Sequence, residues 1–144
     1  MKPSEFTDLL DEAKIVAAIN AAESVTSGEI RVFVSSKEVD DALSHAERRF
    51  EKLGMTKTRE RNGVLLYFAP RSRKFAICGD LGVHEKCGPA FWEGLVAEMG
   101  GHLREGHFTD AVVHAVTKAG ALLAEHFPRR GDDTDELSNE ISRD

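Results

Sequence analysis

The sequence has few cysteines, no long apolar run and no surplus of positive charge. Only two cysteines occur in 144 residues, Cys78 and Cys87, and their spacing matches no zinc motif. We expect both to be buried or half-buried thiols of a protein from a reducing compartment. No apolar run reaches transmembrane length, and the N-terminal residues lack the apolar core of a signal peptide. The expected protein is therefore cytoplasmic and has no transmembrane segment.

The charge balance limits the classes of partner. The formal net charge is −6, from 25 acidic and 19 basic residues. Proteins that bind nucleic acid usually carry a surplus of Lys and Arg, so nucleic acid is not expected as a partner. A small basic group, formed by Arg71, Arg73 and Lys74, is expected to be a solvated turn.

The chain also lacks the nucleophile motifs of common phosphatases. Neither cysteine is followed by the arginine that a cysteine-phosphatase loop requires, and the sequence contains no aspartyl-phosphate motif and no P-loop. A phosphatase reaction would therefore need metal-activated water, or a general base such as Asp80 or His84. These two residues are the catalytic candidates.

The hydrophobic pattern predicts one α/β domain over residues 1–128. An amphipathic helix from Val39 to Leu53 separates the first two expected strands, which should therefore be parallel, with a right-handed crossover. The third strand should return antiparallel beside the second, giving the strand order 1-2-3. The expected strands are 29–34, 63–69 and 74–78.

Helices are expected to cover both faces of this small mixed sheet. Strand 63–69 is apolar on both sides, which requires two covering layers and predicts a three-layer α/β/α sandwich. Residues 129–144 are polar and acidic, so we expect a flexible tail, although Leu137 and Ile141 could dock as a short helix. The other predicted helices run from Asp11 to Ser24, from Phe91 to a stop at Gly100-Gly101, and from the N-cap Thr109 to Phe127.

Polar and glycine residues mark one end of the predicted sheet. Glu29 starts the first strand, Asn62 precedes the second and Asp80 follows the third, so the topology brings these chain positions to the same end. This end could bind an anion through backbone N–H groups, or a cation through Glu29, Asn62 and Asp80. The same residue types also make tight turns and loop caps, and both interpretations stay open. The candidate groove comprises Gly28, Glu29, Arg61, Asn62, Gly63, Gly79, Asp80 and Gly82.

Short motifs follow one another in a specific order along residues 23–127. They are Thr26-Ser-Gly-Glu-Ile, Asn62-Gly63-Val-Leu-Leu, Gly79-Asp80…Gly82, Phe91-Trp92…Met99, Gly106-His-Phe and Phe127-Pro128. Together they resemble the TPM-domain family, which comprises acid-phosphatase-like domains of thylakoid-lumen and bacterial proteins. The resemblance implies an α/β/α sandwich with a polar groove at one sheet end. It also implies Ca²⁺ or Mg²⁺ binding in some members and phosphatase activity in a few, with no cofactor required for the fold.

One position departs from the family pattern. Many members have an acidic residue before the Asn-Gly pair, where this chain has Arg61. A cation at this point works against a site for Ca²⁺ or Mg²⁺, which needs several oxygen ligands.

Two functions therefore remain open. The first is a phosphatase-like or ion-binding groove that takes a small phosphoester. The alternative is a non-enzymatic interaction module in which the sheet end, the hairpin tip or the tail binds another protein. Arg61 and the missing nucleophile motif favour the alternative.

Overall fold

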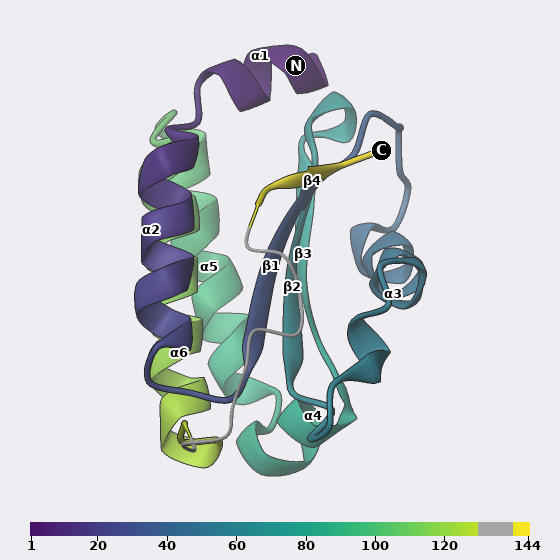
Figure 1. Cartoon of the computed structure of the whole chain (residues 1–144). Coiled ribbons are helices and arrows are strands. Elements are labelled where there is room, and N and C mark those ends of the chain that lie inside the picture. The colour runs from purple at the N-terminus through teal and green to yellow at the C-terminus, as the bar shows by residue number, and fades with distance from the viewer. Residues whose placement is uncertain (130–139) are drawn as a thin grey trace.

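Four strands form a single mixed sheet in the computed structural model, which describes residues 1–129 and 140–144 (Figure 1). The strand order is β3-β2-β1-β4. β1 pairs in parallel with β2 and β4, and β2 pairs antiparallel with β3, so the predicted order of the first three strands is confirmed. The strands are β1 (Glu29–Val34), β2 (Gly63–Ala69), β3 (Lys74–Gly79) and β4 (Ser142–Arg143).

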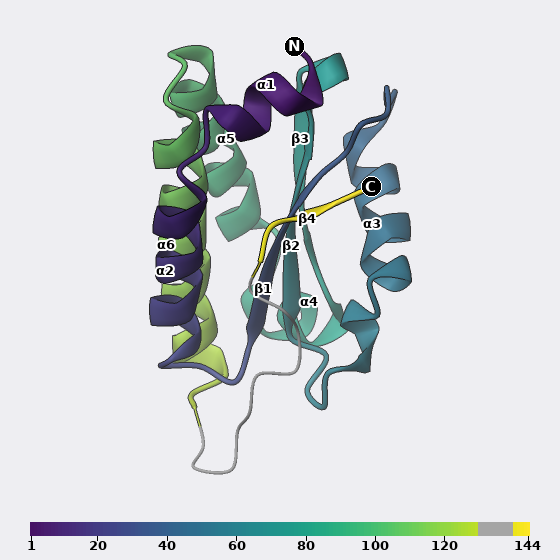
Figure 2. The ribbon, with the colours of Figure 1, turned by 45° about the horizontal axis from the view of Figure 1, so that its top comes forward.

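Helices cover both faces of the sheet, as the three-layer prediction requires. α2, α5 and α6 lie against one face and α3 lies against the other, an arrangement seen in both views of the ribbon (Figures 1 and 2). No helix within residues 1–129 and 140–144 is long and apolar enough to span a bilayer. The helices are α1 (Pro3–Asp8), α2 (Glu12–Glu23), α3 (Ala42–Lys52), α4 (Leu81–Cys87), α5 (Ala90–Arg104) and α6 (Phe108–His126).

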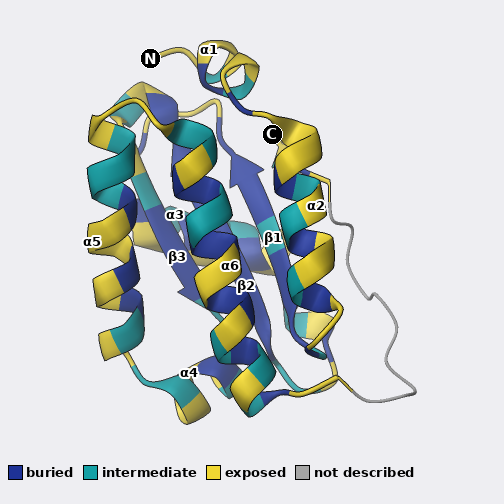
Figure 3. Cartoon of the chain, turned by 90° about the vertical axis from the view of Figure 1, so that its left-hand side faces the viewer, coloured by how far each residue is buried: buried dark blue, intermediate teal, exposed yellow. Residues whose placement is uncertain are grey.

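The central strand β2 is buried along its whole length. Its side chains alternate between two apolar clusters, with Val64, Leu66 and Phe68 facing the three-helix layer and Leu65 and Tyr67 facing α3. The strands lie behind this helix layer in Figure 3 and are coloured mostly as buried. The prediction that two layers of helices cover the strand, made from its apolar residues on both sides, is therefore confirmed.

The observed helix ends differ from the predicted ones more than the observed strand ends do. Asp11 caps α2 as expected, because its side chain accepts a hydrogen bond from the Lys14 N–H. Thr109 does not cap α6; its hydroxyl instead accepts a hydrogen bond from the Asp11 N–H, 3.0 Å away. α5 does not stop at Gly100-Gly101 but continues to Arg104. Leu95, Met99 and Leu103 continue its apolar face, and this burial outweighs the helix penalty of glycine, about 1 kcal/mol each.

The last residues of the chain join the sheet instead of forming part of a flexible tail. β4 pairs with Phe33 and Val34 of β1, and Ile141 is buried beside it. Asp144 accepts hydrogen bonds from the Ser35 hydroxyl at 2.9 Å and the Ser36 N–H at 2.6 Å. The flexible-tail expectation is wrong for residues 140–144. For residues 130–139, including Leu137 of the alternative short helix, it lies outside the described residues.

Candidate functional site

The three strand ends meet as the topology requires. Glu29 is the register partner of Gly63, and the Glu29 N–H donates to the Asn62 carbonyl at 3.4 Å. The Asp80 N–H donates to the Gly63 carbonyl at 3.0 Å. We call this region, from Gly28 and Glu29 to Arg61–Gly63 and Gly79–Gly82, the sheet end.

Arg61 and Asp80 form a bidentate ion pair at the sheet end. The Arg61 Nε lies 2.7 Å from one Asp80 carboxylate oxygen, and its Nη2 lies 2.8 Å from the other. The Arg61 side chain is 42% exposed, whereas that of Asp80 is only 4% exposed. The Asp80 carboxylate raises the pKa of the Arg61 guanidinium, mainly through these hydrogen bonds. Asp80 is therefore already neutralised before any ligand arrives.

Asp80 also fixes the start of the next helix. Its Oδ1 accepts a hydrogen bond from the Leu81 N–H at 2.8 Å, and Asp80 is the N-cap of α4. Both of its carboxylate oxygens therefore have protein partners. His84, the second catalytic candidate, lies exposed on α4. Asp80 therefore has a structural role, and because both of its oxygens already accept hydrogen bonds, it is poorly placed to act as a general base.

Asn62 lies in a polar cluster that we define as Ser27, Thr58, Glu60 and Asn62. Its side-chain amide donates to the Ser27 hydroxyl at 3.1 Å, and its backbone N–H donates to the Thr58 hydroxyl at 3.2 Å. The Ser27 hydroxyl donates in turn to Glu60, 2.5 Å away. Asn62 is 1% exposed, and its Oδ1 has no hydrogen-bond partner among the residues that the structure describes. A buried acceptor of this kind is a candidate ligand atom.

Glu29 is buried at the first position of β1. Strand alternation places it on the same sheet face as Phe33, which is the face that α3 covers. Beside it, Thr26 donates a short hydrogen bond to the Phe127 carbonyl and accepts one from the Gly28 N–H at 3.0 Å. These contacts tie the start of β1 to the end of α6.

Gly82 allows two backbone segments to touch. A Cβ atom at this position would lie 2.3 Å from the Glu60 carbonyl oxygen and 2.8 Å from that of Arg61. The Gly82 N–H donates to the same Arg61 carbonyl at 2.9 Å. This close approach supports the interpretation that the glycine at this position is needed for the turn and its packing.

A groove of about 790 Å³ runs beside β3, between α3 on one side and α4 and α5 on the other. Arg61, Asp80 and His84 lie along it, together with residues 75–79 of β3. Exposed apolar side chains also line it: Leu43 is 47% exposed, Val96 37% and Leu81 58%. Besides Asp80, its acidic side chains are Asp41, which caps α3, and Glu47, Glu51 and Glu93, and we therefore call it the acidic groove.

The outer edge of β3 faces this groove. The hydrogen bond from the Asp80 N–H to the Gly63 carbonyl sets the phase of the antiparallel ladder, in which bonded and non-bonded pairs alternate. The N–H and C=O groups of Phe75, Ile77 and Gly79 consequently point away from β2. No described strand pairs with this side of β3.

Neither cysteine is placed to act as a nucleophile. Burial, together with the charges of Glu47 and Asp80, raises the pKa of the Cys78 thiol to about 12. Burial also raises the pKa of Cys87, with a further contribution from Glu125. Both thiols are free, and the charge effect on Cys78 reflects the acidic character of the groove.

Carboxylates do not gather into an evident metal centre. Within residues 1–129 and 140–144, no group of three or more His, Cys, Asp or Glu side chains is arranged to hold a metal ion. The cation site expected from Glu29, Asn62 and Asp80 stays a prediction. Its Asp80 ligand would have to leave Arg61 first.

Sequence reasoning missed the acidic groove and most of the polar cluster. Glu47 and Glu51 are four residues apart on α3, and this spacing was the available signal for a charged helix face. Ser27, Thr58 and Glu60 come from loops, and their contacts depend on backbone turns that no periodic pattern encodes. The sequence also did not predict the ion pair between Arg61 and Asp80, although it did predict that the positive charge of Arg61 would work against a cation site here.

Comparisons with known proteins show to which family the chain is similar. The model of the TPM domain matches residues 4–122. The NMR structure of the BA42 protein from the psychrophilic bacterium Bizionia argentinensis is 38% identical, covers 92% of each chain and has a TM-score of 0.85. The NMR structure of the N-terminal domain of a P. gingivalis protein is 16% identical, covers 90% of this chain and 98% of that one, and has a TM-score of 0.60. At that identity the likeness shows the fold alone. A comparison with curated proteins found no match.

Proposed function

This chain belongs to the TPM domain family, and we propose that its function is to bind a basic, extended segment of another protein in the acidic groove. The observation that carries this proposal is the outer edge of β3, which pairs with no strand among residues 1–129 and 140–144 and lines the groove from Phe75 to Gly79. An exposed strand edge can accept one more strand through main-chain hydrogen bonds. Phe75, Ile77 and Gly79 would supply these donors and acceptors.

The charge of the groove selects a basic occupant. Glu47, Glu51 and Glu93 have no ion-pair partner among residues 1–129 and 140–144, and Arg61 is already paired with Asp80. Basic side chains on an added strand would therefore meet unpaired carboxylates on both sides of the groove. Leu43 and Val96 offer apolar contacts between these charges, one from each flanking helix.

Two labelled heptapeptides test this function by fluorescence anisotropy. The first alternates Lys and Val, and the second alternates Glu and Val. We expect the Lys peptide to bind, the Glu peptide not to bind, and added salt to weaken the complex. Two further versions of the Lys peptide carry N-methyl groups on either the odd-numbered or the even-numbered residues. Methylation of the amides that face β3 should abolish binding, and methylation of the amides that point away from β3 should spare it.

Variants of the groove provide the matched controls. Glu47→Gln combined with Glu51→Gln should weaken the Lys peptide severalfold, whereas Glu85→Gln, on an exposed part of α4 outside the groove lining, should not. Ile77→Pro removes an outward N–H without breaking a bond to β2, but it also truncates a buried side chain. Ile77→Ala, which keeps the N–H, is therefore its control, and the proline variant should weaken the Lys peptide more than the alanine variant does. Equal binding of the Lys and Glu peptides, or insensitivity to the double substitution, would refute the proposal.

A second candidate function is divalent cation binding at the sheet end. The buried Oδ1 of Asn62, with no partner among the described residues, is the observation that favours it. Asn62 and Glu29 would supply hard oxygen ligands, and Asp80 would join them once it is released from Arg61. A cation held there would polarise a phosphoester, which is the substrate class this candidate would take.

Calorimetry with Ca²⁺ separates this second candidate from the first. Arg61→Asp should strengthen Ca²⁺ binding measurably, because it frees Asp80 and adds a carboxylate. A phosphomonoester assay with and without Ca²⁺, Mg²⁺ and Mn²⁺ should show no turnover if the chain acts only as an interaction module. If neither Arg61→Asp nor the wild type binds any of these ions, the sheet end has no cation-dependent function.

A further inference from the structure

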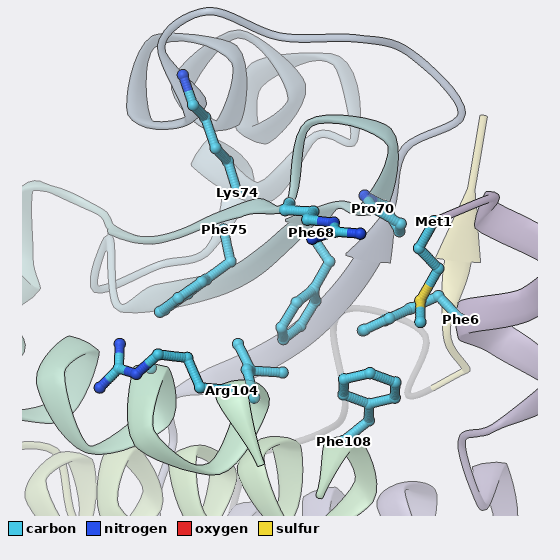
Figure 4. A pocket seen from close by; sticks show the side chains of 11 residues that line it. Met1, Phe6, Phe68, Pro70, Lys74, Phe75, Arg104 and Phe108 are labelled. Atoms are coloured by element: carbon cyan, nitrogen blue, oxygen red, sulfur yellow. The ribbon is translucent and has the colours of Figure 1, made fainter. Parts of the chain in front are cut away.

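A separate pocket of about 450 Å³ lies at the opposite end of the sheet, beside the hairpin that joins β2 and β3. α1, α5 and α6 close it on the helix side (Figure 4). Its volume is in the range of small-molecule sites. We call it the aromatic pocket, after the four phenylalanines that line it: Phe6, Phe68, Phe75 and Phe108.

The four rings form a continuous wall. The centroids of Phe75 and Phe68 are 6.2 Å apart, those of Phe68 and Phe6 are 5.3 Å apart, and those of Phe6 and Phe108 are 5.3 Å apart. Phe6 and Phe68 are buried, whereas Phe75 and Phe108 keep part of their surface exposed. Exposed aromatic surface beside a cavity favours a flat or extended apolar ligand.

The charged side chains at this pocket are cations. Arg73 and Arg104 line it, no Asp or Glu lines it, and neither arginine has an ion-pair partner in the part of the chain that the structure describes. Arg104 lies over Gly100, where an added Cβ would be 3.2 Å from its Nη1. Lys74 holds its charge away from the rings: its ammonium donates to the Asp40 carbonyl at 2.6 Å, and its side chain points away from the rings in Figure 4.

An apolar wall with two unpaired arginines calls for a ligand with one apolar and one anionic end. Guanidinium groups match carboxylate, sulfonate and phosphate oxygens through paired hydrogen bonds. The protein as a whole carries a net charge of −6, so an affinity for anions at this pocket would have to come from the local arginines and not from the overall charge. We propose that the aromatic pocket binds a small amphipathic anion, with its apolar body against the phenylalanines and its head group at Arg73 and Arg104.

Two matched fluorescent probes test this proposal. 1-Anilinonaphthalene-8-sulfonate carries a sulfonate on an aromatic body, and N-phenyl-1-naphthylamine has the same body without the charge. We expect the sulfonate probe to bind one to one and at least about threefold more tightly than the neutral probe. In ¹H–¹⁵N spectra it should shift the amide signals of Phe75, Gly100 and Leu103, and leave those of Gly79 and Asp80 unchanged. Decanoate and 2-naphthoate as competitors then distinguish an acyl ligand from an aromatic one.

Charge-removing variants decide whether the two arginines act as inferred. Arg73→Gln and Arg104→Gln should each weaken the sulfonate probe about two- to fivefold and leave the neutral probe unchanged. Arg48→Gln, on the exposed surface of α3, is the control and should affect neither probe. Circular dichroism shows whether each variant is folded. Equal affinities for the two probes, shifts confined to other regions, or indifference to both arginine variants would each overturn the proposal.

Discussion

At the scale of single residues, Asp80 combines two roles that the sequence could not separate. It caps α4 by accepting a hydrogen bond from the Leu81 N–H, and it accepts hydrogen bonds from both the Nε and the Nη2 of Arg61. The pattern Gly79-Asp80-Leu81-Gly82 indicated a polar turn, but the partner of the carboxylate depends on the backbone of Arg61. That residue has a φ of 51°, in the left-handed region, which local sequence patterns do not reveal for arginine.

Two substitutions of Asp80 separate the cap from the ion pair. Asp80→Asn keeps a capping side chain but loses the charge, whereas Asp80→Ala loses both. We expect Asp80→Ala to lower the free energy of unfolding by about 1 kcal/mol more than Asp80→Asn does, which is the usual cost of losing an N-cap. Urea denaturation followed by circular dichroism measures the difference. Equal losses would show that the cap contributes nothing.

Gly82 and Gly94 offer a matched test of close backbone packing. Both are helical, but only Gly82 lies against another segment, and an added Cβ at Gly94 would meet nothing within 4 Å. Gly82→Ala should destabilise the protein by about 1–3 kcal/mol because the clash is with backbone oxygens. Gly94→Ala should stabilise it by about 0.5–1 kcal/mol, the difference in helix propensity. Losses of the same size at both positions would contradict the packing explanation for Gly82.

At the scale of elements, β4 shows how a short segment can escape sequence analysis. Two residues, Ser142 and Arg143, cannot display a periodic pattern, and the polar residues before them indicated a tail. What holds the segment is tertiary: the burial of Ile141, the pairing with β1, and the contacts of Asp144 with Ser35 and Ser36. Strands 29–34, 63–69 and 74–78 were predictable because each carries enough apolar residues to define its own faces.

Removing residues 140–144 should therefore lower the melting temperature. The loss of one buried isoleucine and two ladder pairs is expected to reduce it by roughly 3–6 °C for a domain of this size. Differential scanning calorimetry of the shortened and full chains measures the shift. Ile141→Ala should reproduce part of it, and an unchanged melting temperature would show that β4 does not contribute to stability.

The docking of β4 should also depend on pH. Burial alone would raise the pKa of Asp144, but hydrogen bonds from Ser36 and Ser35 and the charge of Arg49, 3.6 Å away, lower it overall. A carboxyl group with a lowered folded-state pKa stabilises the fold fully above its unfolded value, about 3.9, and loses this contribution as the pH falls further. The difference in melting temperature between wild type and Asp144→Asn should accordingly be largest near pH 7 and shrink below pH 4. A difference that is constant across this range would contradict the role of the carboxylate.

At the scale of the whole molecule, the fold was predictable and the chemistry of its surfaces was not. The doubly apolar β2 required helices on both faces, and the helix between β1 and β2 required parallel strands, so the layers and the order of the first three strands followed from the sequence. The acidic groove and the aromatic pocket are made by side chains from four or more elements that lie far apart along the chain. Their composition is set by packing, which a single sequence does not encode residue by residue.

The sheet as a whole makes one further prediction, for hydrogen exchange. In β3 the amides of Ala76 and Cys78 bond to β2, whereas those of Phe75, Ile77 and Gly79 point into the acidic groove. The second set should exchange at least roughly tenfold faster than the first and than the amides of β2, giving an alternating pattern along one strand. Adding the Lys peptide should slow this second set selectively if it binds as an extra strand. If all five amides are equally protected at low protein concentration, the outer edge of β3 is already covered, and the groove could not accept a partner there.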